Sequence, residues 1–226
     1  MNEDLVSIDS FFRRYPLKKY SAKEIILASG NEIRLIYFVR SGIARSFYID
    51  EKGNELTINL LKPFTFFPIS TILAGKDIAY DFQAFTNVEV NISPVKDVLE
   101  FLEHDNGFKN LLVKNFASGL EGYLLRSFFL IKGSAMQKVA STFLMLLGRF
   151  GKEENGKRCI DIPLTHQDIA DLSGITRETA SIQMGILMKE KLISRRGKTT
   201  FILDFKGLSE KAVVGDEDGS LLNISF

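Results

Sequence analysis

The stretch Leu164-Thr-His-Gln-Asp-Ile-Ala-Asp-Leu-Ser-Gly-Ile-Thr-Arg-Glu-Thr-Ala-Ser-Ile-Gln-Met-Gly-Ile-Leu-Met188 decides how the rest of the chain is interpreted. Thr165 precedes a short apolar pattern and has Asp168 three residues later, which is the capping-box arrangement that opens a helix. Gly174 predicts a sharp turn, and Thr176 is a second cap, so another helix should begin at Arg177. Two helices joined by so short a turn are typical of a helix-turn-helix.

The second helix is expected to have two faces. One repeats apolar residues at helical spacing and should pack on the first helix: Ala180, Met184, Leu187 and Met188. The other lies at the N-terminal end, where a recognition helix meets base edges: Arg177, Glu178, Ser181 and Ile182. After this helix, 192–194 and 199–203 predict two strands around the basic turn Arg195-Arg-Gly-Lys198. A helix-turn-helix followed by such a hairpin is a winged helix.

This part of the chain resembles the DNA-binding domain of the CRP/FNR superfamily of bacterial transcription regulators. The resemblance is carried by Thr-Arg-Glu-Thr at 176–179 and Leu-Ile-Ser-x-x-Gly-Lys-Thr at 192–199. It implies phosphate contacts at six positions: Thr165, Gln167, Thr176, Thr179, Arg196 and Lys198. Many relatives place an arginine where this chain has Ile182, so the half-site sequence does not carry over.

The four residues of the reading face suit base recognition. A guanidinium such as that of Arg177 can donate two hydrogen bonds to guanine. Glu178 either accepts from cytosine N4 or only complements the helix dipole. Ser181 can bond bases or phosphates, and Ile182 can contact a thymine methyl group.

Composition sets further limits. The net charge is only +1, so affinity for nucleic acid must come from a local patch, which we place at Lys189, Lys191, Arg195, Arg196 and Lys198. Cys159 is the single cysteine and indicates a buried strand thiol, with a redox role as the alternative.

No metal site and no cofactor are expected. The N-terminus has no secretory pattern and no apolar window is long enough to span a bilayer, so we expect a cytoplasmic protein without membrane contact.

The N-terminal part alternates short β-rich runs with turn residues, after a predicted helix at 5–15 that Pro16 ends. The predicted strands are 24–28, 35–40, 44–49, 56–61, 82–85 and 88–92. Many short strands at this spacing predict a jelly-roll β-barrel. The segment 37–45 also resembles the β-roll of the cyclic-nucleotide-binding type found in the same family.

The resemblance does not extend to a cyclic-nucleotide site. Relatives that bind cyclic AMP carry an arginine in the roll for the cyclic phosphate, and here no arginine occurs between Arg45 and Arg126. Neither the cysteine cluster of iron–sulfur members nor the sensor histidine of haem members is present. Five aromatic residues are candidates for an apolar effector pocket, with ordinary core packing as the alternative: Phe64, Phe66, Phe67, Tyr80 and Phe82.

After Pro94 the periodicity becomes helical, and helices are predicted at 95–103, 107–132 and 135–150. The long one has a heptad-like stripe of Leu112, Phe116, Gly119, Tyr123 and Leu130. The stripe either packs on the roll or, as the resemblance implies, forms the seam of a homodimer. A polar loop is predicted at 151–156 and a strand at 158–164. The tail from 207 contains a loop at 215–219 and ends in apolar residues.

The sequence thus predicts an α+β protein with an N-terminal jelly-roll sensor domain at 1–105, a dimerisation helix at 106–133 and a winged helix-turn-helix domain at 134–226. The resemblance implies a transcription regulator, not an enzyme, that binds double-stranded DNA at a pseudo-palindromic operator as a homodimer. An unknown small effector would control it, and RNA polymerase would be a partner of an activator. Two alternatives stay open: a constitutive DNA binder, and a β-roll binding module or cupin-like enzyme with an accessory winged helix.

Overall fold

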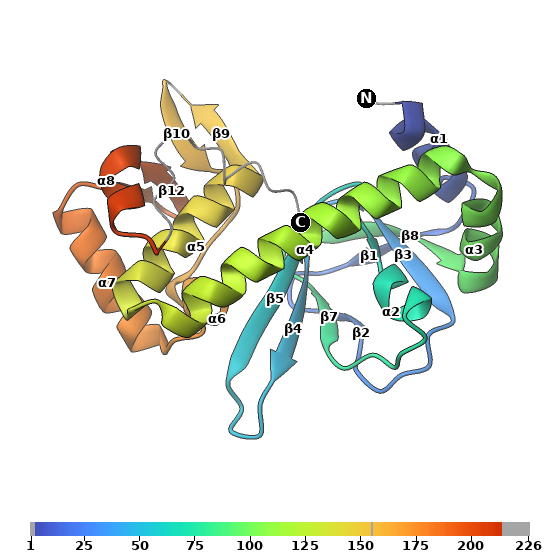
Figure 1. The fold of residues 1–226 in the computed structure, drawn as a ribbon, viewed down its shortest axis with the longest axis horizontal. Coiled ribbons are helices and arrows are strands. Elements are labelled where there is room, and N and C mark those ends of the chain that lie inside the picture. The colour runs from blue at the N-terminus through green and yellow to red at the C-terminus, as the bar shows by residue number, and fades with distance from the viewer. Residues whose placement is uncertain (1–2, 155, 214–226) are drawn as a thin grey trace. The chain divides into compact units, whose positions relative to one another are not determined.

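The computed structural model describes residues 3–154 and 156–213 (Figure 1). The chain divides into two units, Met1–Lys114 and Asn115–Phe226. The division falls inside the helix α4 (Asn106–Lys132), so this helix contributes residues to both units. The three-part division at 105/106 and 133/134 stays a prediction.

Two four-stranded antiparallel sheets form the first unit, which confirms the predicted β-roll. One sheet has the order β1-β8-β3-β6 and the other has the order β2-β7-β4-β5. The strands of the first are β1 (Leu17–Tyr20), β8 (Val88–Pro94), β3 (Leu35–Ser41) and β6 (Phe66–Phe67). Those of the second are β2 (Ile25–Leu27), β7 (Asp81–Ala84), β4 (Ala44–Ile49) and β5 (Glu55–Leu61). The six predicted strands are all present, while β1 and β6 were not predicted.

Helices pack at one end of the roll, where Figure 1 shows α1, α3 and the first turns of α4 gathered together. Their bounds are Glu3–Phe12 for α1, Ile69–Leu73 for α2 and Val95–His104 for α3. Side chains from α1, β3 and α4 form one buried cluster, which includes the rings of Phe12 and Phe38, stacked 4.5 Å apart. A second cluster lies between the two sheets. Because successive strand residues point to opposite faces, Phe66 enters the first cluster and Phe67 the second.

The second unit consists of helices and one antiparallel sheet of the order β11-β12-β10-β9. Its helices besides α4 are α5 (Ala135–Phe150), α6 (His166–Ser173), α7 (Arg177–Lys189) and α8 (Phe205–Glu210). Its strands are β9 (Gly151–Glu154), β10 (Lys157–Ile160), β11 (Ile193–Arg196) and β12 (Thr199–Ile202). The predicted helix-turn-helix and hairpin are therefore confirmed as α6, α7 and the β11–β12 wing.

Two predictions about the strands of this unit were wrong. The polar loop expected at 151–156 is the edge strand β9, which pairs with β10 through Gly151–Glu154. Lysine and glutamate have low strand propensity, yet they are common on exposed edges. The strand expected at 158–164 ends at Ile160, and Cys159 is fully buried in it, as predicted. The expected loop at 215–219 and the apolar end of the tail lie outside the described residues.

Within the described ranges, no helix combines the length and the hydropathy that crossing a bilayer requires.

Candidate nucleic-acid interface

The helix-turn-helix begins at a complete capping box. The Thr165 side chain accepts a hydrogen bond from the Asp168 backbone N–H at 3.1 Å, and the Asp168 carboxylate accepts one from the Thr165 backbone N–H at 2.7 Å. These two bonds satisfy amide groups that have no partner inside a first helical turn. The start of α6 is thus fixed by the residues that predicted it.

The turn between the helices is fixed by Gly174. Its φ of +60° lies in the left-handed region, and its N–H bonds back to the Ala170 carbonyl as the helix ends. Thr176 then caps α7 by accepting from the Thr179 N–H at 3.2 Å. The second helix therefore starts at Arg177, as the sequence predicts.

The inward face of α7 is apolar and fully buried. Ala180, Met184 and Leu187 have no exposed surface. Met188 was expected to join them and does not, because 37% of it is exposed. At 100° per residue, Met188 lies about 80° around the helix from Ala180, at the margin of the packed face.

The leading edge of α7 faces outward. Arg177, Glu178 and Ile182 are exposed, Ile182 to 61%. Ser181 is half-buried, and its Oγ lies 3.0 Å from Nδ1 of His166, the first residue of α6. The structure therefore places all four predicted base-contact residues along one edge, with one of them held by a neighbour that the sequence did not single out.

The predicted phosphate-contact residues lie at the start of α6, the start of α7 and the tip of the wing. Thr165, Gln167, Thr176, Arg196 and Lys198 are exposed, and Thr179 is half-buried. The Gln167 amide donates to the Asp171 carboxylate at 2.7 Å, so Gln167 is already engaged within α6. Gly197 forms the turn of the wing with a φ of +61° and leaves Arg196 and Lys198 on either side of it.

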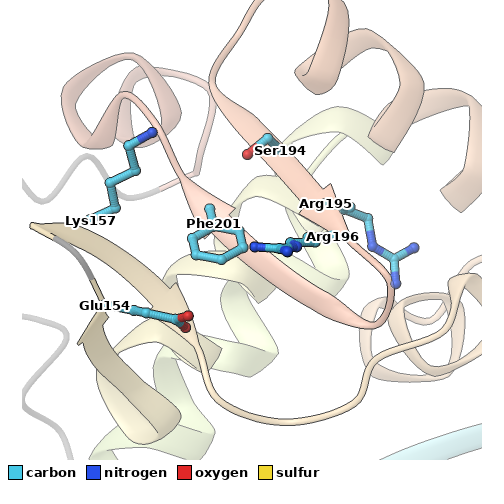
Figure 2. A pocket seen from close by; sticks show the side chains of 6 residues that line it. All are labelled: Glu154, Lys157, Ser194, Arg195, Arg196 and Phe201. Atoms are coloured by element: carbon cyan, nitrogen blue, oxygen red, sulfur yellow. The ribbon is translucent and has the colours of Figure 1, made fainter.

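The two adjacent arginines of β11 serve different purposes. Arg195 is half-buried and donates through Nη2 to the Leu164 carbonyl, just before α6, and burial lowers its pKa. Figure 2 shows the Arg196 side chain directed toward Phe201 while Arg195 turns the other way. Arg195 thus ties the wing to the helix-turn-helix, and Arg196 remains available to a partner.

A hollow lies on the outer face of the wing sheet (Figure 2). Its lining comes from strands β9 to β12: Glu154, Lys157, Ser194, Arg195, Arg196 and Phe201. The carboxylate of Glu154 opposes the cationic groups, so the hollow is not a simple anion site. No three histidine, cysteine, aspartate or glutamate side chains gather as metal ligands in the part of the chain that the structure describes.

Buried polar groups behind the helix-turn-helix were missed from the sequence. Arg126 of α4 donates through Nη2 to the Leu172 carbonyl at 2.9 Å, and Thr142 and Ser173 share a hydrogen bond of 2.9 Å. Burial lowers the pKa of Arg126 to about 10, so the guanidinium stays charged at neutral pH. The signal for this role was an arginine that interrupts an otherwise apolar helical stretch.

The five candidate effector-pocket residues are not brought together. Phe64 is 42% exposed, and Phe66 lies in the cluster beneath α1 and α4. Phe67 stacks on Phe82 at 4.5 Å, and Tyr80 lies 5.4 Å from the same ring. Only these last three share one site, inside the core of the roll.

The stripe on α4 is displaced from the predicted one. Leu112 is buried in the core of the first unit, so it is not free for a second chain, and Leu130 is half-buried. Phe116 and Tyr123 are exposed, whereas Gly119 is buried. Seven apolar side chains are exposed along the helix at spacings of mostly three and four: Val113, Phe116, Leu120, Tyr123, Leu124, Phe128 and Ile131. We call these seven residues the α4 stripe.

Comparison with known proteins agrees with this geometry. Residues 137–211 match the family model of the Crp-like helix-turn-helix domain, and residues 17–105 match that of the cyclic nucleotide-binding domain. The global nitrogen regulator of Nostoc sp. (strain PCC 7120 / SAG 25.82 / UTEX 2576) is 29% identical over 184 residues, which cover 79% of this chain and 81% of the relative. The transcriptional activator protein FnrL of Cereibacter sphaeroides is 28% identical over 211 residues, 90% of this chain and 83% of the relative.

Solved structures show the same fold. A transcriptional regulator of the CRP/FNR family from Thermus thermophilus matches with a TM-score of 0.67 and 27% identity over 89% of this chain and all (100%) of that one. A mutant of CooA from Carboxydothermus hydrogenoformans matches with a TM-score of 0.76 and 19% identity over 89% of each chain. At that identity the second likeness concerns the fold alone.

Proposed function

The chain belongs to the CRP/FNR family of DNA-binding transcription regulators, and from this we propose that it binds a pseudo-palindromic operator as a homodimer, reading one half-site with each α7. The observation that carries the proposal is the exposed leading edge of α7 beside a wing whose tip presents Arg196 and Lys198. Relatives of this kind are regulators and not enzymes.

Each residue of the leading edge has a proposed base contact. Arg177 donates two hydrogen bonds to guanine O6 and N7. Glu178 accepts from cytosine N4, because a carboxylate facing phosphates would otherwise be repelled. Ile182 packs on a thymine methyl group, and its 61% exposure leaves enough apolar surface for that contact. Ser181 contributes its hydroxyl.

Phosphate contacts position this edge in the groove. Thr165, Thr176 and Thr179 lie at helix N-termini, where backbone N–H groups also favour anions. Arg196 and Lys198 reach the backbone from the wing. Gln167 contributes after exchanging its bond to Asp171 for one to a phosphate.

The α4 stripe supports the dimer. Its spacing matches a coiled-coil seam, and its apolar side chains gain most if a second copy covers them. Two copies of α7 related by a two-fold axis would then enter major grooves about 34 Å apart.

An effector other than a cyclic nucleotide is proposed for the roll, with Phe67, Tyr80 and Phe82 nearest to it. The roll has no arginine between Arg45 and the end of β8, and Arg45 of β4 itself is engaged with Glu55 at 2.6 Å and Gln83 at 2.8 Å. The effector would act by binding the DNA-competent state more tightly. The regulator would work in the cytoplasm and, as an activator, would contact RNA polymerase.

Selection of bound sequences from random duplex DNA by the purified full chain tests the proposal. We expect a two-fold symmetric site with half-sites one helical turn apart. Arg177→Ala and Glu178→Ala should each relax one position per half-site, by about 1–3 kcal/mol. Failure to enrich any sequence at low salt, or a site without symmetry, would contradict the proposal.

A further inference from the structure

His166 and Ser181 connect the two helices of the helix-turn-helix at the edge of the proposed DNA-reading surface. His166 is the first residue of α6, Ser181 lies in the second turn of α7, and Nδ1 and Oγ are 3.0 Å apart. Both side chains are half-buried. The pair is therefore held in place but remains within reach of solvent or of a bound duplex.

Whether Ser181 donates or accepts in this hydrogen bond depends on which other acceptor its hydroxyl proton can reach. Ser127 in α4 donates to the carbonyl four residues earlier at 2.7 Å, as helical serines often do. Within the described ranges Ser181 makes no such bond, and the imidazole is its hydrogen-bond partner. A neutral ring with its proton on Nε2 leaves Nδ1 as an acceptor, so Ser181 donates to it. The Ser181 oxygen then has only lone pairs to offer a third group.

We propose that His166 determines which base Ser181 recognises, because the charge of the imidazole sets whether the Ser181 hydroxyl accepts from DNA or donates to it. With a neutral ring Ser181 accepts, which suits the amino groups of adenine N6 and cytosine N4. When the ring takes a proton from solvent, Nδ1–H donates to Oγ and the hydroxyl proton turns outward. Ser181 then suits the acceptors guanine O6 and N7 or thymine O4.

The charged groups around His166 favour the neutral ring in the free protein. Arg195 faces it from β11, Arg177 faces it from α7, and Asp168 of α6 itself lies near Arg195. Burial and then the charges of the two arginines lower the pKa of His166 below its ordinary value. At pH 7.5 the ring is thus neutral, and with its proton on Nε2 it leaves Ser181 as an acceptor for DNA. DNA phosphates act in the opposite direction, so binding and proton uptake are coupled.

The test rests on the proposed function and uses the full chain in the same selection from random duplex DNA. His166→Lys is the informative variant because an ammonium group only donates, whatever the pH within the protein's stable range. Wild-type protein at pH 7.5 should prefer adenine or cytosine at one position per half-site. His166→Lys should shift that same position toward guanine or thymine by about fivefold or more, the scale of one hydrogen bond.

Ser181→Ala is the matched control for position. It should remove the preference at that position and no other, both alone and combined with His166→Lys. Wild type selected at decreasing pH should move in the same direction as His166→Lys once the pH falls through the lowered pKa of His166, and this arm does not depend on the folding of a variant. A position read by Ser181 whose preference stays unchanged in a folded His166→Lys protein would overturn the inference while leaving the proposed function standing. Absence of any selected sequence from wild type would overturn the proposed function, and the inference with it.

Discussion

Arg126 of α4 caps the end of the first helix of the helix-turn-helix through Leu172, whose carbonyl oxygen lies 2.9 Å from the Arg126 Nη2 atom. The last carbonyl groups of a helix have no partner within it. Arg126 is only 6% exposed, so water is a poor substitute for its donor groups. The guanidinium thus holds α6 at the end opposite to its capping box.

Arg126→Met should destabilise the second unit by about 1–3 kcal/mol, because the buried Leu172 carbonyl loses its charged donor. Urea denaturation of the full chain measures the loss. Lys132→Met, an exposed change at the end of the same helix, should stay within about 0.5 kcal/mol of wild type. Equal midpoints for the two variants would show that the Arg126 bond contributes nothing.

Much of the second unit could be predicted because local chemistry fixes its elements. Capping residues and one left-handed glycine determine where α6 and α7 begin and end, and all of these are visible in the sequence. The edge strand β9 was missed because its charged residues take their strand conformation from pairing with β10, which no local pattern reveals. The His166–Ser181 bond was missed for a similar reason, since its partners are 15 residues apart.

The aromatic residues of β6 and the apolar residues of α4 show that periodicity does not determine which part of the protein an apolar side chain packs against. Phe66 and Phe67 are adjacent in the same strand, so strand geometry sends them to different cores, and the sequence does not say which core receives which ring. Leu112 fits the heptad spacing of the helix but faces the roll, because the first turns of α4 pack on it. Periodicity locates an apolar face without naming its partner.

Lys198→Ala should weaken binding to all DNA sequences alike. Its exposed ammonium group at the wing tip is proposed to neutralise one phosphate, so the slope of log K against log salt should become shallower by about 0.9. Fluorescence anisotropy with specific and random duplexes at several salt concentrations measures this. Lys206→Ala, an exposed change in α8, is the matched control and should leave the slope unchanged. A sequence-dependent loss would assign Lys198 to base reading instead.

Leu120→Glu should turn the proposed dimer into a monomer. Leu120 is 59% exposed in the middle of the α4 stripe, where two glutamates would be buried against each other. Analytical ultracentrifugation gives the mass directly. Asn115→Glu adds the same charge about 140° around the helix from the stripe's centre and should remain dimeric. If both variants keep the wild-type mass, the stripe is not the seam.

Acid should weaken the attachment of α1 to the roll, because protonation of Asp9 removes its ion pairs with Arg13 and Arg40. Burial would raise the pKa of Asp9, but hydrogen bonds and charges from Arg13 and Arg40 outweigh it and leave the pKa below its ordinary value of 3.8. A carboxyl with a lowered folded-state pKa stabilises fully above its unfolded pKa, and this stabilisation is lost as pH falls through the folded value. The free energy of unfolding of wild type should therefore exceed that of Asp9→Asn at pH 7 and converge with it in strong acid. A constant difference across this range would exclude the Asp9 ion pairs as its source.

Alanine substitutions at Gly42 and Gly30 distinguish the free-energy cost of a positive φ from the cost of a steric clash. Both have positive φ, +77° and +75°, which an L side chain adopts at a cost of about 1–2 kcal/mol. Nothing lies within 4 Å of a Cβ placed on Gly30, whereas one placed on Gly42 would be 1.9 Å from the Asn87 carbonyl oxygen. Gly30→Ala should therefore cost only the conformational term. Gly42→Ala must also displace the backbone around Asn87, which pushes apart the turns that join β3 to β4 and β7 to β8. Urea denaturation should show a clearly larger loss for Gly42→Ala, and equal losses would mean that the Asn87 turn yields without cost.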